Sequence, residues 1–287
     1  MGGGGVLFLV IGLVVFYSLR YRRKAGETDE PQQFHTHSGL EIGILAATTG
    51  VMGIFFFLTI TTMLAVNDNP APDRPPDLVI IGHQWWWEAR YPNSGVVTAN
   101  EIHIPSGKRL LVEVRSADVI HDWWVPELGR KMDMIPGTAN HLWMEARHPG
   151  TFLGTCSEFC GTQHAWMRIQ VIAQAPDAFA AWERAQLQKP TAVNGAVAAA
   201  GETLFQQKTC ANCHAIAGTK ANARIGPDLT HLGSRNTLLT GMLENTPENL
   251  TRWLDNPQQI KSGAHMPNFI FTKAEVEALV EYLEHLD

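Results

Sequence analysis

The sequence predicts a membrane-anchored chain in three parts: a hairpin of two transmembrane helices, an all-β domain and an all-α domain. Two apolar stretches near the N-terminus predict the hairpin. Short β-type runs between turn residues predict the β domain, and helical periodicity around a C-x-x-C-H motif predicts the last part. We expect the hairpin in residues 1–70, the β domain in 71–175, a helix and linker in 176–200, and the helical domain in 201–287.

Composition and charge narrow the function classes. The chain has 287 residues, of which 17% are charged, and its formal net charge is −6. Nucleic-acid binding needs a basic face, so this balance argues against a nucleic acid as partner. The four cysteines are too few for a disulfide framework, and they form two pairs, Cys156/Cys160 and Cys210/Cys213, each close to a histidine. Such pairs indicate metal or cofactor attachment.

The two apolar stretches differ in length. Val6–Leu19 is shorter than the roughly 20 residues that a bilayer requires. A signal peptide is the alternative, but the basic residues follow this run and no small-residue cleavage site comes after it. Ile42–Val66 contains no charge and is long enough to cross about 30 Å of hydrocarbon. Basic residues lie between the stretches and acidic ones after the second, so the positive-inside rule places everything after residue 67 outside the cytoplasm.

The middle of the chain has the pattern of a β-sandwich or Greek-key barrel. Runs such as "DLVIIGHQWWWEARYP", "EIHIP", "RLLVEVRS" and "MRIQVIA" are separated by turn residues. In a continuous strand through "QWWWE", Trp85 and Trp87 would share one face and Trp86 would point to the other. A helix is expected to begin near Pro176, and "KPTAVNGAVAAAG" has the composition of a tether.

The C-terminal part carries helix start signals. "TPENLTRWLDN" offers Thr246 as N-cap and Pro247 at the first helical position. "TKAEVEALVEYLEHL" offers Thr272 and Glu275 as a capping box, followed by one apolar stripe. Two helices are therefore expected after residue 245.

The stretch "CSEFCGTQHAWM", residues 156–167, concentrates soft metal donors. A mononuclear blue-copper loop supplies one thiolate, one histidine and one weak methionine, so one thiolate is in excess here. Two thiolates in one loop can bridge two metals, each of which then needs an imidazole and a weak axial donor. His164 and Met167 lie in the loop. His121 in "DVIHDWWVP" is the candidate second imidazole, and the backbone carbonyl of Glu158 is the candidate second axial donor.

Zinc is the main rival at this site, because it also binds cysteine and histidine. Structural zinc usually takes C-x2-C knuckles and has little use for a methionine. A core role without any metal is the third reading. The β setting and the thioether favour copper, so the sequence predicts a dinuclear copper centre.

"CANCH" at residues 210–214 is the attachment signature of c-type haem. Cys210 and Cys213 would form the thioethers, and His214 would be the proximal ligand. A zinc knuckle has a similar pattern, but the sequence holds no second cysteine pair to complete one.

A low-spin haem needs a sixth ligand, and methionine raises its potential. Met242 and Met266 are the candidates. Met266 is favoured because it lies in an irregular loop beside Pro267, just before the last helix, with His265 as the further option. "GPDL" resembles the loop of class I cytochromes c in which the carbonyl of Pro227 would accept the imidazole N–H.

The apolar hairpin, "GHQWWWEARYP", "DVIHDWWVPELGRKMDMIPG" and "CSEFCGTQHAWM" together closely resemble subunit II of haem–copper cytochrome c oxidases, over roughly residues 6–187. The resemblance implies a cupredoxin fold and a mixed-valence CuA centre, whose ligands would be His121, Cys156, Cys160, His164, Met167 and the carbonyl of Glu158. It also implies that the Glu158 side chain helps to hold a magnesium ion at the boundary with subunit I.

Two further residues gain a role from this resemblance. Trp85 matches the surface tryptophan through which electrons enter CuA, and Glu41 matches a glutamate near the mouth of a proton channel of subunit I. The tryptophan that usually follows this glutamate is missing. No acid lies between Glu88 and Glu101, which argues against a strongly electrostatic dock for soluble cytochrome c.

The implied protein is the electron-entry subunit of a bacterial proton-pumping cytochrome c oxidase, with a class I cytochrome c domain fused at its C-terminus. Electrons from an external donor, a cytochrome c or similar, would pass through haem c to CuA and on to haem a of subunit I, where dioxygen is reduced to water. No residue of this chain would be catalytic. The tether would hold the haem at roughly millimolar effective concentration near CuA.

The resemblance also implies partners and a location. Subunit I and the other oxidase subunits would be partners, in the bacterial inner membrane, with both soluble domains on the periplasmic side. A stand-alone membrane-anchored copper/haem electron carrier is the alternative. A nitrous oxide reductase relative would need a histidine-rich copper cluster, whereas the twelve histidines here are scattered. Quinol oxidase subunits lack the bridging cysteines.

Overall fold

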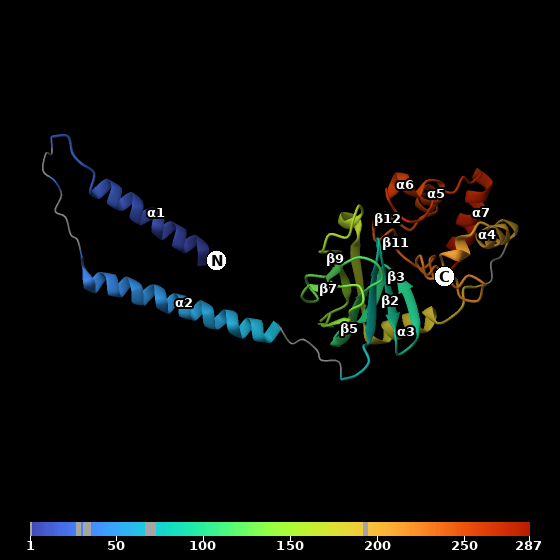
Figure 1. The fold of residues 1–287 in the computed structure, drawn as a ribbon, viewed down its shortest axis with the longest axis horizontal. Helices are drawn as coiled ribbons and strands as arrows, with labels where there is room; N and C mark the ends of the chain where they lie inside the picture. Colours follow the sequence, from blue (N-terminus) through green and yellow to red (C-terminus); the bar gives the residue numbers. More distant parts are fainter. Residues whose placement is uncertain (1, 27–29, 31–35, 67–72, 192–194) are drawn as a thin grey trace. The chain divides into compact units, whose positions relative to one another are not determined.

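A computed structural model describes residues 2–26, 30, 36–66, 73–191 and 195–287 (Figure 1). Parts of the expected proline-rich linker and of the expected tether lie outside these residues. The chain divides into two compact units, Met1–Met63 and Leu64–Asp287. The first unit is helical, and the second contains a β domain followed by a mainly helical domain.

The first unit holds two helices, α1 (Gly2–Arg20) and α2 (Ser38–Val66). Within the described part of the chain, α2 is the one helix that is long and apolar enough to cross a membrane, whereas α1 is a shorter apolar helix. One of the two expected spans is thus supported by length and composition, and the hairpin stays a prediction. Glu41 lies in the first turn of α2, where its carboxylate accepts the His37 N–H at 3.1 Å.

The predicted β-sandwich is confirmed as two five-stranded sheets, in the orders β3-β2-β1-β5-β8 and β4-β10-β9-β6-β7. Their inward side chains form one apolar core. Two neighbouring pairs, β1·β5 and β4·β10, run parallel, and the other neighbours in the two sheets run antiparallel. The strands are β1 Leu78–His83, β2 Trp86–Tyr91, β3 Val96–Ala99, β4 Glu101–Pro105, β5 Leu110–Ser116, β6 His121–Trp124, β7 Met132–Met134, β8 Asn140–Met144, β9 Gly150–Cys156 and β10 Arg168–Gln174.

The tryptophan-rich stretch departs from the prediction. It is not one strand, because β1 ends at His83 and β2 begins at Trp86, which pair directly as a hairpin. Trp85 lies in the turn, so the predicted alternation of faces does not extend to it. The exposed fractions of Trp85, Trp86 and Trp87 are 7%, 9% and 0%. Trp86 stacks on His83 with ring centroids 4.1 Å apart. The period-2 argument holds only within an unbroken strand.

Helix α3 (Pro176–Gln186) begins at the proline that the sequence indicates. It packs on the β domain through Trp182, whose ring stacks on His103 at 4.3 Å and meets Tyr91 edge-on at 5.4 Å. The copper domain, defined here as residues 73–191, therefore includes α3.

The last domain, residues 195–287, contains α4 (Ala196–Gln207), α5 (Pro247–Asp255), α6 (Pro257–Ile260), α7 (Lys273–Glu284) and a short hairpin of β11 (Thr237–Leu238) and β12 (Leu243–Glu244). The predicted cap at Thr246 and the predicted capping box of Thr272 and Glu275 are both present. Helix α4 begins ahead of the boundary expected at Gly201, because the alanine-rich segment before it favours helix.

Candidate metal centre and haem site

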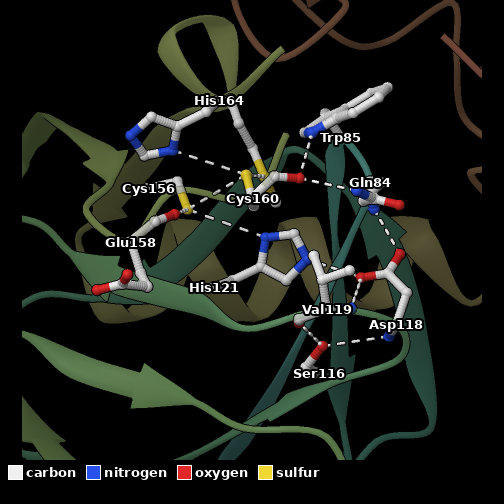
Figure 2. A network of polar contacts seen from close by, with 11 residues as sticks. Gln84, Trp85, Ser116, Asp118, Val119, His121, Cys156, Glu158, Cys160 and His164 are labelled. Carbon is white, nitrogen blue, oxygen red and sulfur yellow. Dashed lines mark hydrogen bonds and ion pairs between the residues drawn. The ribbon is translucent and has the colours of Figure 1, made fainter. Parts of the chain in front are cut away.

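Two cysteine sulfurs meet at one end of the β domain (Figure 2). Cys156 ends β9 and Cys160 lies in the loop that follows, and each residue is 2% exposed. Their Sγ atoms are 3.8 Å apart, well beyond the roughly 2.05 Å of a disulfide, and both thiols are free. The sulfurs are thus close without being bonded, which suits atoms that share a metal.

Each thiol has its own imidazole. His121, fully buried at the start of β6, places Nδ1 3.9 Å from Cys156 Sγ. His164 begins the 3₁₀ helix η1 (His164–Trp166) and places Nδ1 3.6 Å from Cys160 Sγ. Figure 2 shows the two rings approaching the sulfur pair from opposite sides. The distant histidine that the sequence indicates is therefore brought to the loop by the fold.

Each thiol also has one weak donor. Met167 Sδ lies 3.7 Å from Cys160 Sγ, and the Glu158 carbonyl oxygen lies 3.3 Å from Cys156 Sγ. The Glu158 carboxylate points away from the sulfurs (Figure 2). The two thiols and the four donors around them make six, which exceeds the four ligands of one tetrahedral zinc ion. The residues present fit a pair of soft metal ions.

The buried His121 ring is held by residues that sequence reasoning missed. Asp118 Oδ1 lies 2.8 Å from His121 Nε2, so Nε2–H donates to the carboxylate and Nδ1 keeps its lone pair for the sulfur side. Asp118 also accepts the backbone N–H groups of Gln84 and Val119. A Cβ on Gly82 would lie 2.9 Å from the ring. The sequence signal that was overlooked is the acid three residues before the histidine in "DVIH", which is Asp118.

The thiols do not ionise alike. The pKa of Cys156 is lowered to about 3, chiefly by the adjacent Cys160 thiol and further by His121, although burial opposes the shift. The pKa of Cys160 is raised because it lies against Cys156 and is buried. Cys156 is therefore the thiol of the pair that ionises first.

The C-x-x-C-H segment forms the second site. Cys210 begins the 3₁₀ helix η2 (Cys210–Asn212), and Cys213 and His214 follow it. His214 Nδ1 donates to the carbonyl oxygen of Pro227 at 2.7 Å, which confirms the expected hydrogen bond. Burial lowers the pKa of His214, which favours the neutral ring that iron ligation through Nε2 would need. A Cβ on Gly226 would lie 2.6 Å from the ring, so the loop passes very close to it.

Met266 packs against the core of the last domain, together with Cys210. Gln258 holds its loop in shape, because its side-chain N–H groups donate to the carbonyls of Ala264 and Met266, at 2.8 and 3.0 Å. The same side chain accepts the Gly263 N–H at 2.9 Å. The other candidate methionine, Met242, lies between β11 and β12, and Met266 stays the predicted ligand.

Comparisons with known proteins match both the β domain and the last domain. The family model "Cytochrome C oxidase subunit II, periplasmic domain" matches residues 94–174, and the model "Cytochrome c" matches residues 198–287. Cytochrome c oxidase subunit 2 of Alkalihalophilus pseudofirmus is 36% identical over 290 aligned positions, covering 98% of this chain and 83% of the relative. Cytochrome c oxidase subunit 2 of Bacillus sp. strain PS3 is 30% identical, covering 93% and 80%.

Among solved structures, the periplasmic domain of subunit II of cytochrome oxidase from Bradyrhizobium japonicum is 32% identical, with a TM-score of 0.39, covering 41% of this chain and 96% of that one. The whole-chain likeness to the two curated relatives shows the family. The chain belongs to the cytochrome c oxidase subunit II family and carries a cytochrome c domain at its C-terminus.

Proposed function

We propose that this chain is the electron-entry subunit of a bacterial haem–copper cytochrome c oxidase, with a dinuclear CuA centre in its copper domain and one covalent haem c in residues 195–287. When bound, these groups supply the one-electron redox sites through which an external donor feeds haem a of subunit I, where dioxygen is reduced. The observation that carries the proposal is the convergence of four further donors on one pair of thiols, in a chain that also carries a C-x-x-C-H motif.

The protein supplies a rigid and dry ligand set. The proposed copper ligands are His121, Cys156, Cys160, His164, Met167 and the carbonyl of Glu158. Strands β6 and β9 carry His121 and Cys156, and both cysteine residues are buried. The ligands should therefore move little when the charge on the metal pair changes. The Glu158 carboxylate faces away from the sulfurs, where it is available for a magnesium ion shared with subunit I.

In the last domain, hereafter the haem domain, the proposed haem residues are Cys210, Cys213, His214 and Met266. The thiols attach the porphyrin, and Pro227 fixes the plane of the proximal imidazole by accepting its N–H. Gln258 fixes the loop that presents the methionine. A methionine opposite a histidine raises the reduction potential of the iron.

The membrane arrangement follows from charge and length. We infer that α2 spans the bilayer and that α1 is a second span, which makes the chain multi-pass. The basic residues after α1 place the connecting segment in the cytoplasm and both soluble domains on the periplasmic side. Glu41 would then lie near a proton-channel mouth of subunit I, and Trp85 would lie on the electron route into the copper pair. Subunit I and the other oxidase subunits are the partners.

The test is metal analysis and spectroscopy of the full chain purified from its native membrane. We expect one covalently attached haem on this chain, an EPR signal from one unpaired electron shared by two coppers, and co-purification of a large polypeptide that carries further haem. Cys160→Ser should abolish the shared-electron signal, because one bridging sulfur is lost. Ser157→Ala is the matched control in the same loop, since its buried hydroxyl has no hydrogen-bond partner.

Two results would contradict the proposal. One is a single zinc ion in the thiol site of well-metallated protein. The other is isolation of the chain with both cofactors and without any oxidase subunit, which would indicate the stand-alone carrier.

A further inference from the structure

The copper domain and the haem domain lie in one compact unit, and two loops of the haem domain carry buried contacts to the copper domain. One is the segment 236–241 around β11, and the other is the segment 261–265 before α7. One buried ionisable side chain takes part in the contact at each loop. Glu101 of the copper domain accepts hydrogen bonds from the first loop, and Lys261 is itself part of the second loop. The exposed fractions of these two residues are 3% and 5%.

Glu101 begins β4, and its carboxylate is satisfied entirely by the haem domain. Oε1 accepts the Thr237 N–H at 2.7 Å and the Thr237 hydroxyl at 2.8 Å. Oε2 accepts the Asn236 N–H at 3.1 Å and its side-chain amide at 3.3 Å. The half-buried Arg235 precedes Asn236 in the chain; burial lowers its pKa, and Asp228 and then Glu101 act to raise it. A buried carboxylate with four donors is a strong and directional contact.

Lys261 makes the reciprocal contact from the haem domain. Its Nζ donates to the Trp85 carbonyl at 2.7 Å and to Thr240 Oγ1 at 3.4 Å. The Thr240 hydroxyl in turn donates to the carbonyl of Trp166, which lies between two of the proposed copper ligands. Because a buried ammonium is unfavourable without such acceptors, the lysine fits only one placement of the two domains.

Trp85 lies between the two sites. Its indole N–H donates to the Cys160 carbonyl at 2.9 Å, and its ring centroid is 5.4 Å from that of His265, the neighbour of Met266. Gln163 of the copper loop donates to the Ser262 carbonyl at 2.6 Å. The loop that carries the proposed haem methionine therefore rests on the loop that carries the copper ligands, with the indole between them.

We propose that Glu101 and Lys261 lock the haem domain onto the copper domain in one fixed orientation, so that Trp85 is an internal relay and not a surface entrance. Both residues are positioning residues. The inference rests on the proposed function, because it assumes two redox sites to connect. It adds that electron transfer between these two sites does not require a mobile, tethered haem domain to diffuse to the copper domain. Transient contacts usually keep their charges at a wet rim, whereas both ionisable groups here are buried.

The first test is hydrogen–deuterium exchange on the full chain in its oxidase complex. We expect the amides of Asn236 and Thr237 to be protected, and their exchange to accelerate by about tenfold or more in Glu101→Gln, because the charged acceptor is lost. Lys261→Met should have the same effect. Asp177→Asn and Lys220→Met are the matched controls, since both side chains are exposed on the same two domains. Exchange that is unchanged by both interface substitutions would overturn the lock.

The second test leaves both interface residues intact and lengthens the linker after Thr191. If the haem domain were merely tethered, doubling the linker would slow haem-to-copper electron transfer roughly threefold, because effective concentration falls as about the −3/2 power of length. A locked domain should transfer electrons at an unchanged rate, with unchanged protection of residues 236–237. A threefold loss would overturn the proposal.

The two proposals fail in different ways. A chain that binds neither copper nor haem would refute the proposed function, whatever the exchange data show. A chain that carries both cofactors, but has unprotected amides at residues 236–237 and a rate that falls with linker length, would refute the lock alone.

Discussion

The orientation of one histidine ring depends on a carboxylate that binds no metal. Asp118 accepts a hydrogen bond from Nε2–H of His121, so that Nδ1 faces the sulfurs. Gly82 leaves room for the ring because it has no Cβ. Because neutral imidazole can carry its proton on either nitrogen, the carboxylate also selects the tautomer that binds a metal.

Replacing this carboxylate should weaken copper binding. We expect Asp118→Ala to lower copper affinity by about 10–100-fold, because the ring loses its orienting partner. Asp118→Asn should lose less, since its amide oxygen can still accept from Nε2–H. Affinity is measured by competition with a copper chelator, with Asp177→Asn as the control. Equal affinities in all four proteins would show that Asp118 has no positioning role.

In the haem domain, the contact of α4 with α7 depends on one glycine. A Cβ on Gly201 would lie 1.9 Å from the Ala278 carbonyl oxygen and 2.7 Å from the Tyr282 Cβ. The two helices therefore approach backbone to backbone at this position, and Phe205 of α4 packs edge-on against Tyr282, with centroids 5.9 Å apart. No side chain fits here without moving the helices apart.

The substitution Gly201→Ala should therefore destabilise the haem domain. We expect a loss of about 1–3 kcal/mol in the free energy of unfolding, which is typical of overpacking, with any gain in helix propensity outweighed. Denaturant unfolding followed by haem absorbance measures it. Ala199→Leu adds more volume on the exposed side of the same helix and should have little effect. Equal stability of the two variants would contradict the close contact.

For the chain as a whole, the contact between domains decides where a donor can bind. The resemblance implies a surface tryptophan, but Trp85 is 7% exposed, with Lys261 and His265 against it. The missing acids after the tryptophan motif agree with this arrangement. The first acid that follows, Glu101, holds the chain's own haem domain. If the proposed lock holds, we expect an external donor to meet the haem domain first.

Rapid mixing of the oxidase with a reduced external donor should show this order. We expect haem c to be reduced first, and the copper signal to change only as haem c becomes reoxidised. Glu101→Gln should uncover Trp85 part of the time, and direct copper reduction should then appear. Copper reduced in step with donor oxidation in the unmodified protein, while haem c is still oxidised, would contradict the occluded entrance.

The sequence by itself determined the local chemistry and the outline of the fold. The spacing of Cys156, Cys160, His164 and Met167, the C-x-x-C-H motif, the helix caps and the strand runs all depend on neighbours along the chain. Backbone geometry translates such spacings directly into structure. The β-sandwich and the helix starts were predictable for this reason, whereas the histidine–Pro227 contact was predicted from the resemblance of "GPDL" to the loop of class I cytochromes c.

Only the tertiary structure decided the contacts between distant segments. The turn at Trp85, the asparagine and threonine that meet Glu101 more than 130 positions along the chain, and Lys261, 176 positions from Trp85, leave no periodic trace in the sequence. Such contacts depend on how two complete domains pack. The sequence around a single acid or lysine does not show whether its side chain will be exposed to water or buried in an interface. The two cases differ in burial, which is a property of the folded chain. A buried charge costs free energy unless it is paired, whereas an exposed one does not.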